Sequence, residues 1–241
     1  MIYQCVKDFE IPVINENGMM TERILKITSG MFFKESKDNI LSGAEIKLEN
    51  IFDNTFIEIS KETLKSSFKD IEFIDLLEMQ KQLDEEVAKP RENGFIPRKR
   101  TLLDIKLALD DEFQEWLREL PQELNFKTWK KKEYKREDEL IELTDCLFFI
   151  LQWVNANNFT KSMLDIYSRK LEIFEKAINE NLRTLISMFK NYLWTDKTLI
   201  IFSIWICICI ESGFTKDEII QTYLTKWKRN ITVRIKEEWS L

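Results

Sequence analysis

The stretch LALDDEFQEWLREL, residues 107–120, combines a helical pattern with one exception to it. At about 3.6 residues per helical turn, Leu109, Trp116 and Leu120 fall on one side and form part of an apolar stripe. Glu112 stands in that stripe, where the spacing calls for an apolar side chain. An ionised carboxylate on the buried side of a helix is costly unless its charge is compensated. The stretch therefore predicts a helix that carries part of a functional site.

A second acidic residue follows at Glu115, and residues three apart share a helix face. The same spacing recurs with Glu142 and Asp145 on a later predicted helix, EDELIELTDCLFFILQWV, which begins near Arg136. The chain between the two pairs is long enough for one helix to end and for the next to return antiparallel. We therefore expect the four carboxylates to face one another. Solvated surface acids are the alternative, but the apolar run CLFFIL directly after Asp145 predicts a helix buried on most sides.

Four clustered carboxylates would repel one another, so either some are protonated or cations lie among them. Two divalent ions would balance the four charges, and oxygen ligands without His or Cys favour Mg²⁺, with Mn²⁺ as a substitute. Two or more Mg²⁺ ions held by carboxylates are typical of phosphoryl chemistry, in which a nearby carboxylate takes the proton of the attacking water. A helical scaffold with an acidic seam is the structural alternative.

Composition excludes several other chemistries. The chain has no histidine, which rules out Ser-His-Asp and Cys-His catalysis and His-ligated zinc. Its net charge of −6 does not favour direct binding to nucleic acid or to an anionic membrane. The four cysteines form no metal or disulfide pattern, no leader opens the chain, and the longest apolar run, LIIFSIWICICI, is too short to span a bilayer. We expect a cytoplasmic protein.

Two parts of the chain differ in pattern. Residues 1–68 contain strand-like segments such as CVKDFEIPVI and ILKITSGMFF, and they are predicted to form a small β-rich module of three to five strands whose role is unknown. Residues 69–241 are predicted to form a bundle of five or six helices, so the fold class is mainly α. The first helix candidate is KDIEFIDLLEMQKQLDEEVAK, and a helical pattern also covers residues 161–193. Thr101 and Thr215, each followed three residues later by an acid, predict capping boxes.

The sequence around these motifs resembles that of the dimeric dUTPase family, part of the all-α NTP pyrophosphatase superfamily that includes the MazG proteins. The similarity covers about residues 72–235, through DLLEMQKQLDEEV, LDIKLALDDEFQEWLRELPQELNFKTWKKKEY and ELIELTDCLFF, and it resembles the branch found in bacteriophages and their hosts. The resemblance implies a homodimeric dUTP diphosphatase with an all-α catalytic domain at residues 69–241. Such an enzyme attacks the β-phosphorus of dUTP with water, releases dUMP and pyrophosphate, and accepts dUDP too.

The resemblance also implies four Mg²⁺ ligands: Glu112, Glu115, Glu142 and Asp145. One glutamate of the first pair would orient or deprotonate the attacking water. The residues implied in substrate binding are Gln80, Asp84, Trp129, Lys132, Lys226, Asn230 and Arg234. In the family, the first two of these positions meet the uracil and deoxyribose, the tryptophan lies near the base, and the last helix contacts phosphate and sugar.

The last helix departs from the family pattern. Val233 stands at the position where relatives have an arginine, and Arg234 comes one residue later, so Arg229 or Arg234 is expected to supply that contact. Basic residues available to a triphosphate form three clusters, at 98–100, 130–132 and 226–229.

Two other functions stay open at this point. A pyrophosphohydrolase of the same class with another base specificity would use the same carboxylates, and the altered last helix allows it. A non-catalytic helical protein could use the acidic seam to bind a partner, and the N-terminal module could serve an unknown regulatory partner. Without the family, Gln80 and Asp84 are equally well interpreted as surface residues, Trp129 as a packing anchor and the lysine run as a solvated surface.

Overall fold

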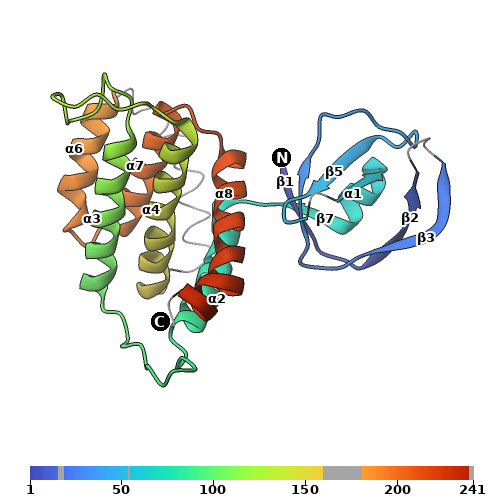
Figure 1. Cartoon of the computed structure of the whole chain (residues 1–241), viewed down its shortest axis with the longest axis horizontal. Helices are drawn as coiled ribbons and strands as arrows, with labels where there is room; N and C mark the ends of the chain where they lie inside the picture. Colours follow the sequence, from blue (N-terminus) through green and yellow to red (C-terminus); the bar gives the residue numbers. More distant parts are fainter. Residues whose placement is uncertain (16–18, 54, 160–180, 239–241) are drawn as a thin grey trace. The chain divides into compact units, whose positions relative to one another are not determined.

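The chain forms two compact units, Met1–Glu72 and Phe73–Leu241, each described here by itself (Figure 1). The computed structural model describes residues 1–15, 19–53, 55–159 and 181–238. Of the helical pattern predicted over residues 161–193, the part at 161–180 lies outside them. The first unit consists mainly of antiparallel strands and the second of helices. This confirms the mainly α class with a small β-rich part at the N-terminus.

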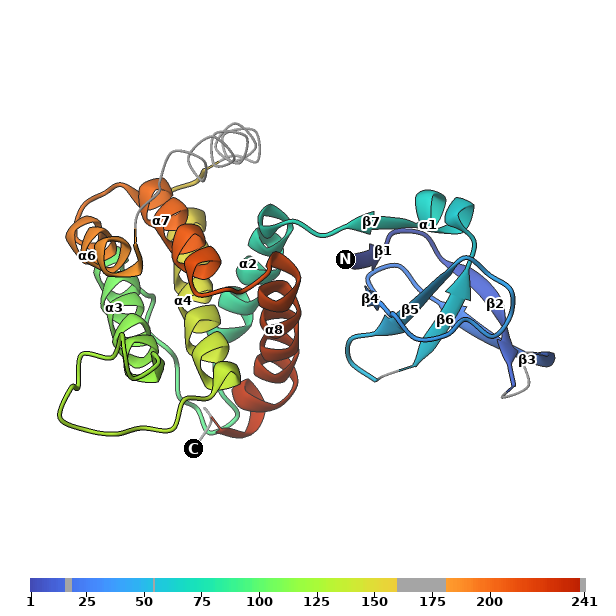
Figure 2. The same ribbon diagram turned by 90° about the horizontal axis from the view of Figure 1, so that it is seen from above.

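The N-terminal unit packs a β-hairpin against a five-stranded sheet whose strand order is β6-β5-β4-β1-β7 (Figure 2). The elements of the unit are β1 (Ile2–Cys5), β2 (Phe9–Ile14), β3 (Met20–Ile27), β4 (Phe32–Glu35), β5 (Ile46–Asn50), β6 (Phe56–Ile59), α1 (Lys61–Ser67) and β7 (Phe68–Asp70). The hairpin is β2 with β3, and its Ile27 meets Cys5, Phe33 and Leu48 of the sheet in one apolar core. The unit therefore has a core of its own.

Two sequence expectations for this region differ from the structure. The segment ILKITSGMFF was expected as one strand, but Gly30, at φ 95°, turns the chain between β3 and β4. The described residues hence contain more strands than the three to five expected. The first long helix was expected to begin near Lys69, but Phe68–Asp70 pairs with β1 and completes the sheet. The division between the units accordingly falls after Glu72.

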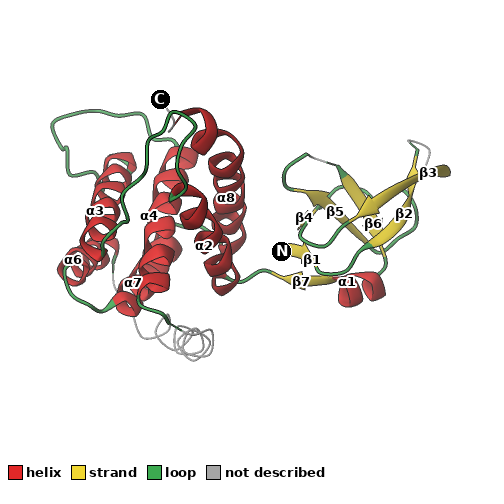
Figure 3. Cartoon of the chain, turned by 90° about the horizontal axis from the view of Figure 1, so that it is seen from below, coloured by secondary structure: helices red, strands yellow, loops and turns green. Residues whose placement is uncertain are grey.

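The C-terminal unit is helical, and α4 stands in the middle of its helices (Figure 3). The helices are α2 (Leu76–Val87), α3 (Leu102–Glu119), α4 (Arg136–Ala156), α6 (Leu182–Leu193), α7 (Thr198–Glu211) and α8 (Lys216–Arg229), with the short turn η1 (Phe73–Asp75) before α2 and the π-helical segment η2 (Asn230–Glu238) after α8. Helix α4 contacts α2, α3, α7 and α8. This central position explains the apolar run CLFFIL, since a helix packed on several sides needs apolar residues on all of them.

Both predicted capping boxes are confirmed. Thr101 accepts a hydrogen bond from the backbone of Asp104, and Asp104 accepts one in return, at the start of α3. Thr215 and Glu218 do the same for α8. Each such cap contributes on the order of 1 kcal/mol and fixes where the helix begins. The start of α3 in turn fixes the phase of its acidic residues.

Helix α7 is buried on nearly all sides, as expected for a helix made mostly of apolar residues. Its Trp205 is fully buried and donates through Nε1 to the carbonyl oxygen of Leu143 at 3.0 Å. Within the described ranges, no single helix is long and apolar enough to cross a membrane, and only the bent pair of α7 with Lys216–Glu237 meets the length and composition that a span requires.

Candidate active site

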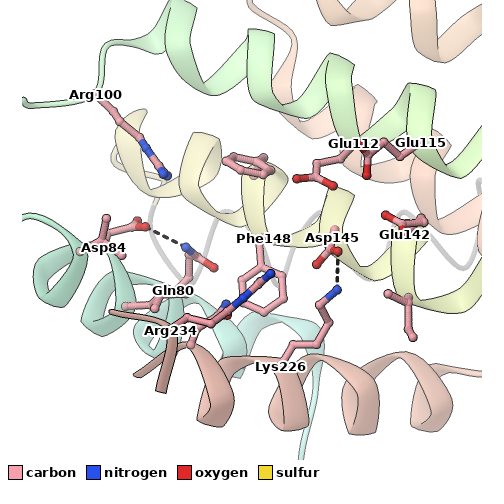
Figure 4. A pocket seen from close by; sticks show the side chains of 15 residues that line it. Gln80, Asp84, Arg100, Glu112, Glu115, Glu142, Asp145, Phe148, Lys226 and Arg234 are labelled. Atoms are coloured by element: carbon pink, nitrogen blue, oxygen red, sulfur yellow. Dashed lines mark hydrogen bonds and ion pairs between the residues drawn. The ribbon is translucent and has the colours of Figure 1, made fainter. Parts of the chain in front are cut away.

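A pocket of about 420 Å³ opens among α2, α3, α4, α8 and η2. Most of the residues that the sequence singled out line it, namely Gln80, Asp84, Glu112, Glu115, Glu142, Asp145, Lys226, Asn230 and Arg234. Figure 4 shows the acidic residues of α3 and α4 at one end of the pocket and Asp84 with Arg100 at the other. The pocket therefore has two chemically different ends.

Three glutamates form the acidic end. Glu112 and Glu115 lie one turn apart on α3, Glu142 faces them from α4, and one carboxylate oxygen of each lies within 4.8 Å of the others. All three side chains are half-buried. Behind them, Trp116 donates through Nε1 to the buried Glu139 at 3.3 Å. This bond ties α3 to α4 directly beside the cluster and holds the glutamates in register.

The environment of the cluster resists negative charge. Burial, followed by the charges of Asp145, Glu115 and Glu142, raises the pKa of Glu112 to about 7. Burial and then Asp145 raise the pKa of Glu142 to about 7 as well. The pKa of Asp145 is also raised by its burial, although Lys226 acts in the opposite direction. A cation placed among these carboxylates would relieve the repulsion, so the cluster could hold a metal ion.

Basic residues face the cluster from the last helix. Lys226 of α8 forms an ion pair with Asp145, and Arg234 of η2 lowers the pKa of the same carboxyl group through its charge. Between them, the buried Asn230 lies at 3.4 Å from Arg234, from Oδ1 to Nη1. Cations and carboxylates therefore meet in the pocket, as the binding of a phosphate chain with its counter-ion requires.

The other end of the pocket is a hydrogen-bonded set of polar side chains. Gln80 and Gln152 both donate from Nε2 to Oδ1 of Asp84, at 2.8 and 2.6 Å. Tyr223 donates to Gln80, and Arg100 donates to Gln152. Burial raises the pKa of Asp84 to about 6, against these two amide donors and the charge of Arg100. This end offers fixed polar groups rather than a concentration of negative charge.

Two of the residues implied in substrate binding lie outside the pocket. Trp129 is 78% exposed on the loop between α3 and α4. Lys132 of the same loop forms an ion pair with Glu119 and donates to the backbone of Arg118. The other lysines of this run are exposed too. Neither Trp129 nor Lys132 contacts the pocket of its own chain.

Sequence reasoning missed Arg100 as a pocket residue. It belongs to a run of three basic residues whose members look alike in the sequence. The structure separates them, because Arg98 forms a bidentate ion pair with Asp104, whereas Arg100 turns into the pocket beside Phe149. Arg100 lies at the end of the pocket away from the glutamates (Figure 4). Only its side-chain direction, which the sequence does not encode locally, distinguishes it.

The sequence model of the dUTPase family matches residues 72–239. The chain belongs to the dUTPase family. A comparison with curated proteins found no match. The family membership confirms the resemblance read from the acidic motifs, and a dUTPase is an enzyme, a dUTP diphosphatase, that acts on a nucleotide. The wider MazG-like superfamily, the phage type and the cytoplasmic location stay predictions of the sequence.

The dUTPase match coincides with the helical unit and contains the whole pocket. Nearly all of the β-rich unit lies before it. dUTPases depend in general on a divalent metal, and the cluster of Glu112, Glu115 and Glu142 is an acidic group of the kind that could hold one. The match to the dUTPase family therefore falls on the helical unit, which contains the pocket.

Proposed function

We propose that the pocket hydrolyses dUTP to dUMP and pyrophosphate with Mg²⁺, through attack of water on the β-phosphorus, and that it also accepts dUDP. The observation that carries the proposal is the cluster of Glu112, Glu115 and Glu142 in the pocket of a dUTPase family member. Attack at the β-phosphorus leaves the bridging oxygen on dUMP. Because dUDP carries the same phosphorus atom, one arrangement of groups serves both substrates.

The donor set fits a hard divalent cation. The clustered glutamates offer only oxygen ligands, and Mg²⁺ prefers these, with Mn²⁺ as a substitute. The raised pKa values of Glu112 and Glu142 support this assignment, because a cation would relieve the repulsion between the carboxylates. We therefore assign the binding of two or more ions to Glu112, Glu115, Glu142 and Asp145. Bound Mg²⁺ supplies charge that neutralises the phosphate oxygens.

Glu112 and Glu115 have the catalytic roles in this proposal. The carboxylate of Glu112 takes the proton of the attacking water, and the carboxylate of Glu115 orients that water. In the metal-free protein, burial raises the pKa of Glu112 to about 7. Mg²⁺ bound beside the carboxylate would lower this pKa, so that Glu112 is ionised and able to accept a proton. The apolar side chains of Leu109, Phe113 and Trp116, which are fully buried on the same helix, keep the carboxylates in place.

The remaining lining residues bind the nucleotide. Lys226 and Arg234 would hold phosphate oxygens, and Asn230 would contact the sugar. Gln80 and Asp84 lie at the end away from the glutamates, where the base arrives once the phosphates occupy the acidic end (Figure 4). The helical unit is proposed to be the helical bundle of the all-α NTP pyrophosphatases.

We also propose a homodimer. We assign Trp129, which is exposed and lies outside its own pocket, to the nucleotide of a second subunit. Lys132 would have to leave Glu119 to make the same contact. Light scattering of the purified protein should give twice the chain mass. In an activity assay, Trp129→Ala should raise KM for dUTP. A monomeric and fully active protein would contradict this part of the proposal.

The decisive test is hydrolysis of each dNTP in the presence of Mg²⁺, followed by measurement of pyrophosphate. We expect turnover of dUTP and a loss of about 100-fold or more in Glu112→Gln, since a positioned proton acceptor contributes about 10²- to 10⁴-fold. Asp111→Asn, an exposed neighbour on the same helix, is the matched control and should keep full activity. Broad turnover would favour a pyrophosphohydrolase of wider specificity. A folded protein that turns over no nucleotide would contradict both enzymes and favour a binding function.

A further inference from the structure

One continuous chain of hydrogen bonds crosses the end of the pocket away from the glutamates. It runs from Tyr223 to Oε1 of Gln80 at 3.1 Å, and from Nε2 of Gln80 to Oδ1 of Asp84 at 2.8 Å. From the other side, Nη1 of Arg100 donates to Oε1 of Gln152 at 3.1 Å, and Nε2 of Gln152 donates to the same Oδ1 at 2.6 Å. Two of the four bonds thus end on one carboxylate oxygen, and the other two end on the amide groups that donate them.

The two ends of this chain fix the direction of every bond in it. A guanidinium group can only donate, and the phenol of Tyr223 stays protonated because burial raises its pKa well above the usual value. Both ends therefore occupy the amide oxygens of Gln80 and Gln152. The amide nitrogens are left to point at Asp84, whose carboxylate is held as an acceptor.

Two groups of this network are left for a ligand. Among the residues that the structure describes, both side-chain donors to Asp84 reach Oδ1, and Oδ2 receives none. Arg100 has five N–H groups, of which the bond to Gln152 uses one, and its guanidinium lies 5.6 Å from the ring centre of Phe149. Asp84 and Arg100 both line the pocket. An acceptor and a donor therefore lie at the same end of the pocket, connected through the amide of Gln152.

We propose that Arg100 is a specificity-determining residue that donates to the O4 carbonyl of the uracil ring while Oδ2 of Asp84 accepts from N3–H. The inference rests on the proposed function, because the base reaches this end only if the phosphates lie at the glutamates. O4 is the uracil carbonyl farthest from the sugar, and Arg100 lies at the pocket end farthest from the glutamates (Figure 4). The paired acceptor and donor match the adjacent N–H and carbonyl of that edge.

This arrangement disfavours cytosine. In the same position, cytosine presents an amino group to the donors of Arg100 and a lone pair at N3 to the carboxylate of Asp84. Both pairs repel, and a buried polar group left without a partner costs more than a contact merely lost. Thymine shares the N3–H and O4 of uracil. Arg100 therefore separates uracil from cytosine and does not sense the methyl group of thymine.

Steady-state kinetics of Arg100→Met with dUTP and dCTP test this assignment. A hydrogen bond to a charged group is worth about 1.5–3 kcal/mol, so we expect KM for dUTP to rise by about tenfold or more with kcat little changed. The preference for dUTP over dCTP should fall by a similar factor. Arg100→Lys, which keeps the charge and one donor group, should restore part of the affinity. Arg98→Met is the matched control, since Arg98 pairs with Asp104 outside the pocket, and it should behave as the unaltered protein.

Calorimetric titration with dUMP measures the same contact without turnover. We expect Arg100→Met to bind dUMP about tenfold more weakly, and Arg98→Met to bind it as the unaltered protein does. Unchanged KM, unchanged dUTP preference and unchanged dUMP affinity in Arg100→Met would overturn this inference while leaving dUTP hydrolysis in place. Failure of the unaltered protein to hydrolyse dUTP would instead overturn the proposed function. The two failures are therefore distinguishable.

Discussion

Glu112 shows how a polar residue is accommodated in the apolar stripe of α3. Its neighbours Leu109, Phe113 and Trp116 are fully buried, while its own side chain is half-buried and reaches the pocket. The stripe position thus places the carboxylate at the boundary between core and pocket. Its raised pKa of about 7 means that ionising Glu112 in the folded protein costs more free energy than ionising a solvated glutamate, as long as no cation is bound.

The metal-free protein should lose stability as pH rises from about 5 to about 7.5. Burial raises the pKa of Glu112 and Glu142 in the folded state from 4.5 to about 7, so folding favours their neutral forms. Stability from this source is fully present below about pH 4.5 and is lost as pH rises through about 7. Thermal unfolding in a chelator should show a falling melting temperature over this window, and Mg²⁺ should reverse it.

Glu112→Leu should remove part of this dependence. The variant should be more stable than the unaltered protein at about pH 7.5, by on the order of 2 kcal/mol after solvent screening, and similar to it at about pH 5. It should have no activity. Asp111→Asn, which is exposed, should leave the pH profile unchanged. Equal slopes in Glu112→Leu and the unaltered protein would show that Glu112 does not carry this energy.

The acidic residues could be predicted from the sequence because their spacing is a property of the helix itself. Glu112 and Glu115 lie on one face of any α-helix, and the capping box of Thr101 fixes where that helix starts. Arg100 and Trp129 lie on loops, where no period relates position to direction. Hence the pocket position of Arg100 and the exposure of Trp129 came only from the structure.

At the level of elements, η2 accounts for the offset in the last helix. Hydrogen bonds in a π-helix reach one residue farther than in an α-helix, so each turn takes up more residues. Arg234, four positions after Asn230, therefore returns to the side of the helix that faces the pocket. With the α period, Val233 and Arg234 would both lie near the face of Asn230, so the sequence pattern could not separate them, and it left Arg229 and Arg234 as alternatives. Arg229 is exposed on α8 and does not line the pocket.

Arg234→Gln should weaken dUTP binding, whereas Val233→Gln should not. Arg234 lines the pocket beside Lys226, and loss of a charged contact to phosphate should raise KM by about tenfold. Val233 stands at the position expected from the family pattern but does not line the pocket, which makes it the matched control. The comparison of KM values between the two variants is the measurement. A larger effect at Val233 would mean that the last helix keeps its α period when substrate is bound.

At the level of the whole molecule, the two units differ in sequence pattern, and each is compact by itself. Alternation and helical period predicted where strands and helices occur, since both follow from which side chains must be buried. The same patterns did not place the exact start of α2, because the strand β7 is too short to show a period. The role of the N-terminal unit does not follow from its core, which packing alone explains.

The helical unit alone should retain dUTP hydrolysis. Every residue that lines the pocket belongs to Phe73–Leu241, and the dUTPase match begins at residue 72. We expect kcat/KM of this fragment to lie within about threefold of the full chain, and the Met1–Glu72 fragment to fold without activity, because each unit has its own core. Steady-state assays of both fragments provide the measurement. Complete loss of activity in a folded helical fragment would assign a catalytic role to the β-rich unit.

The hydrogen bond between Tyr223 and Gln80 joins residues that are 143 positions apart. During synthesis, Gln80 leaves the ribosome early, but Gln152 and then Tyr223 follow only when most of the chain has been made. Contacts between such distant segments form slowly, because a long loop must close first. The pocket end around Asp84, which we propose binds the base, is therefore expected to be among the last parts of the helical unit to form. Binding of the nucleotide at this end would thus require that the entire helical unit has folded, from its first long helix to its last.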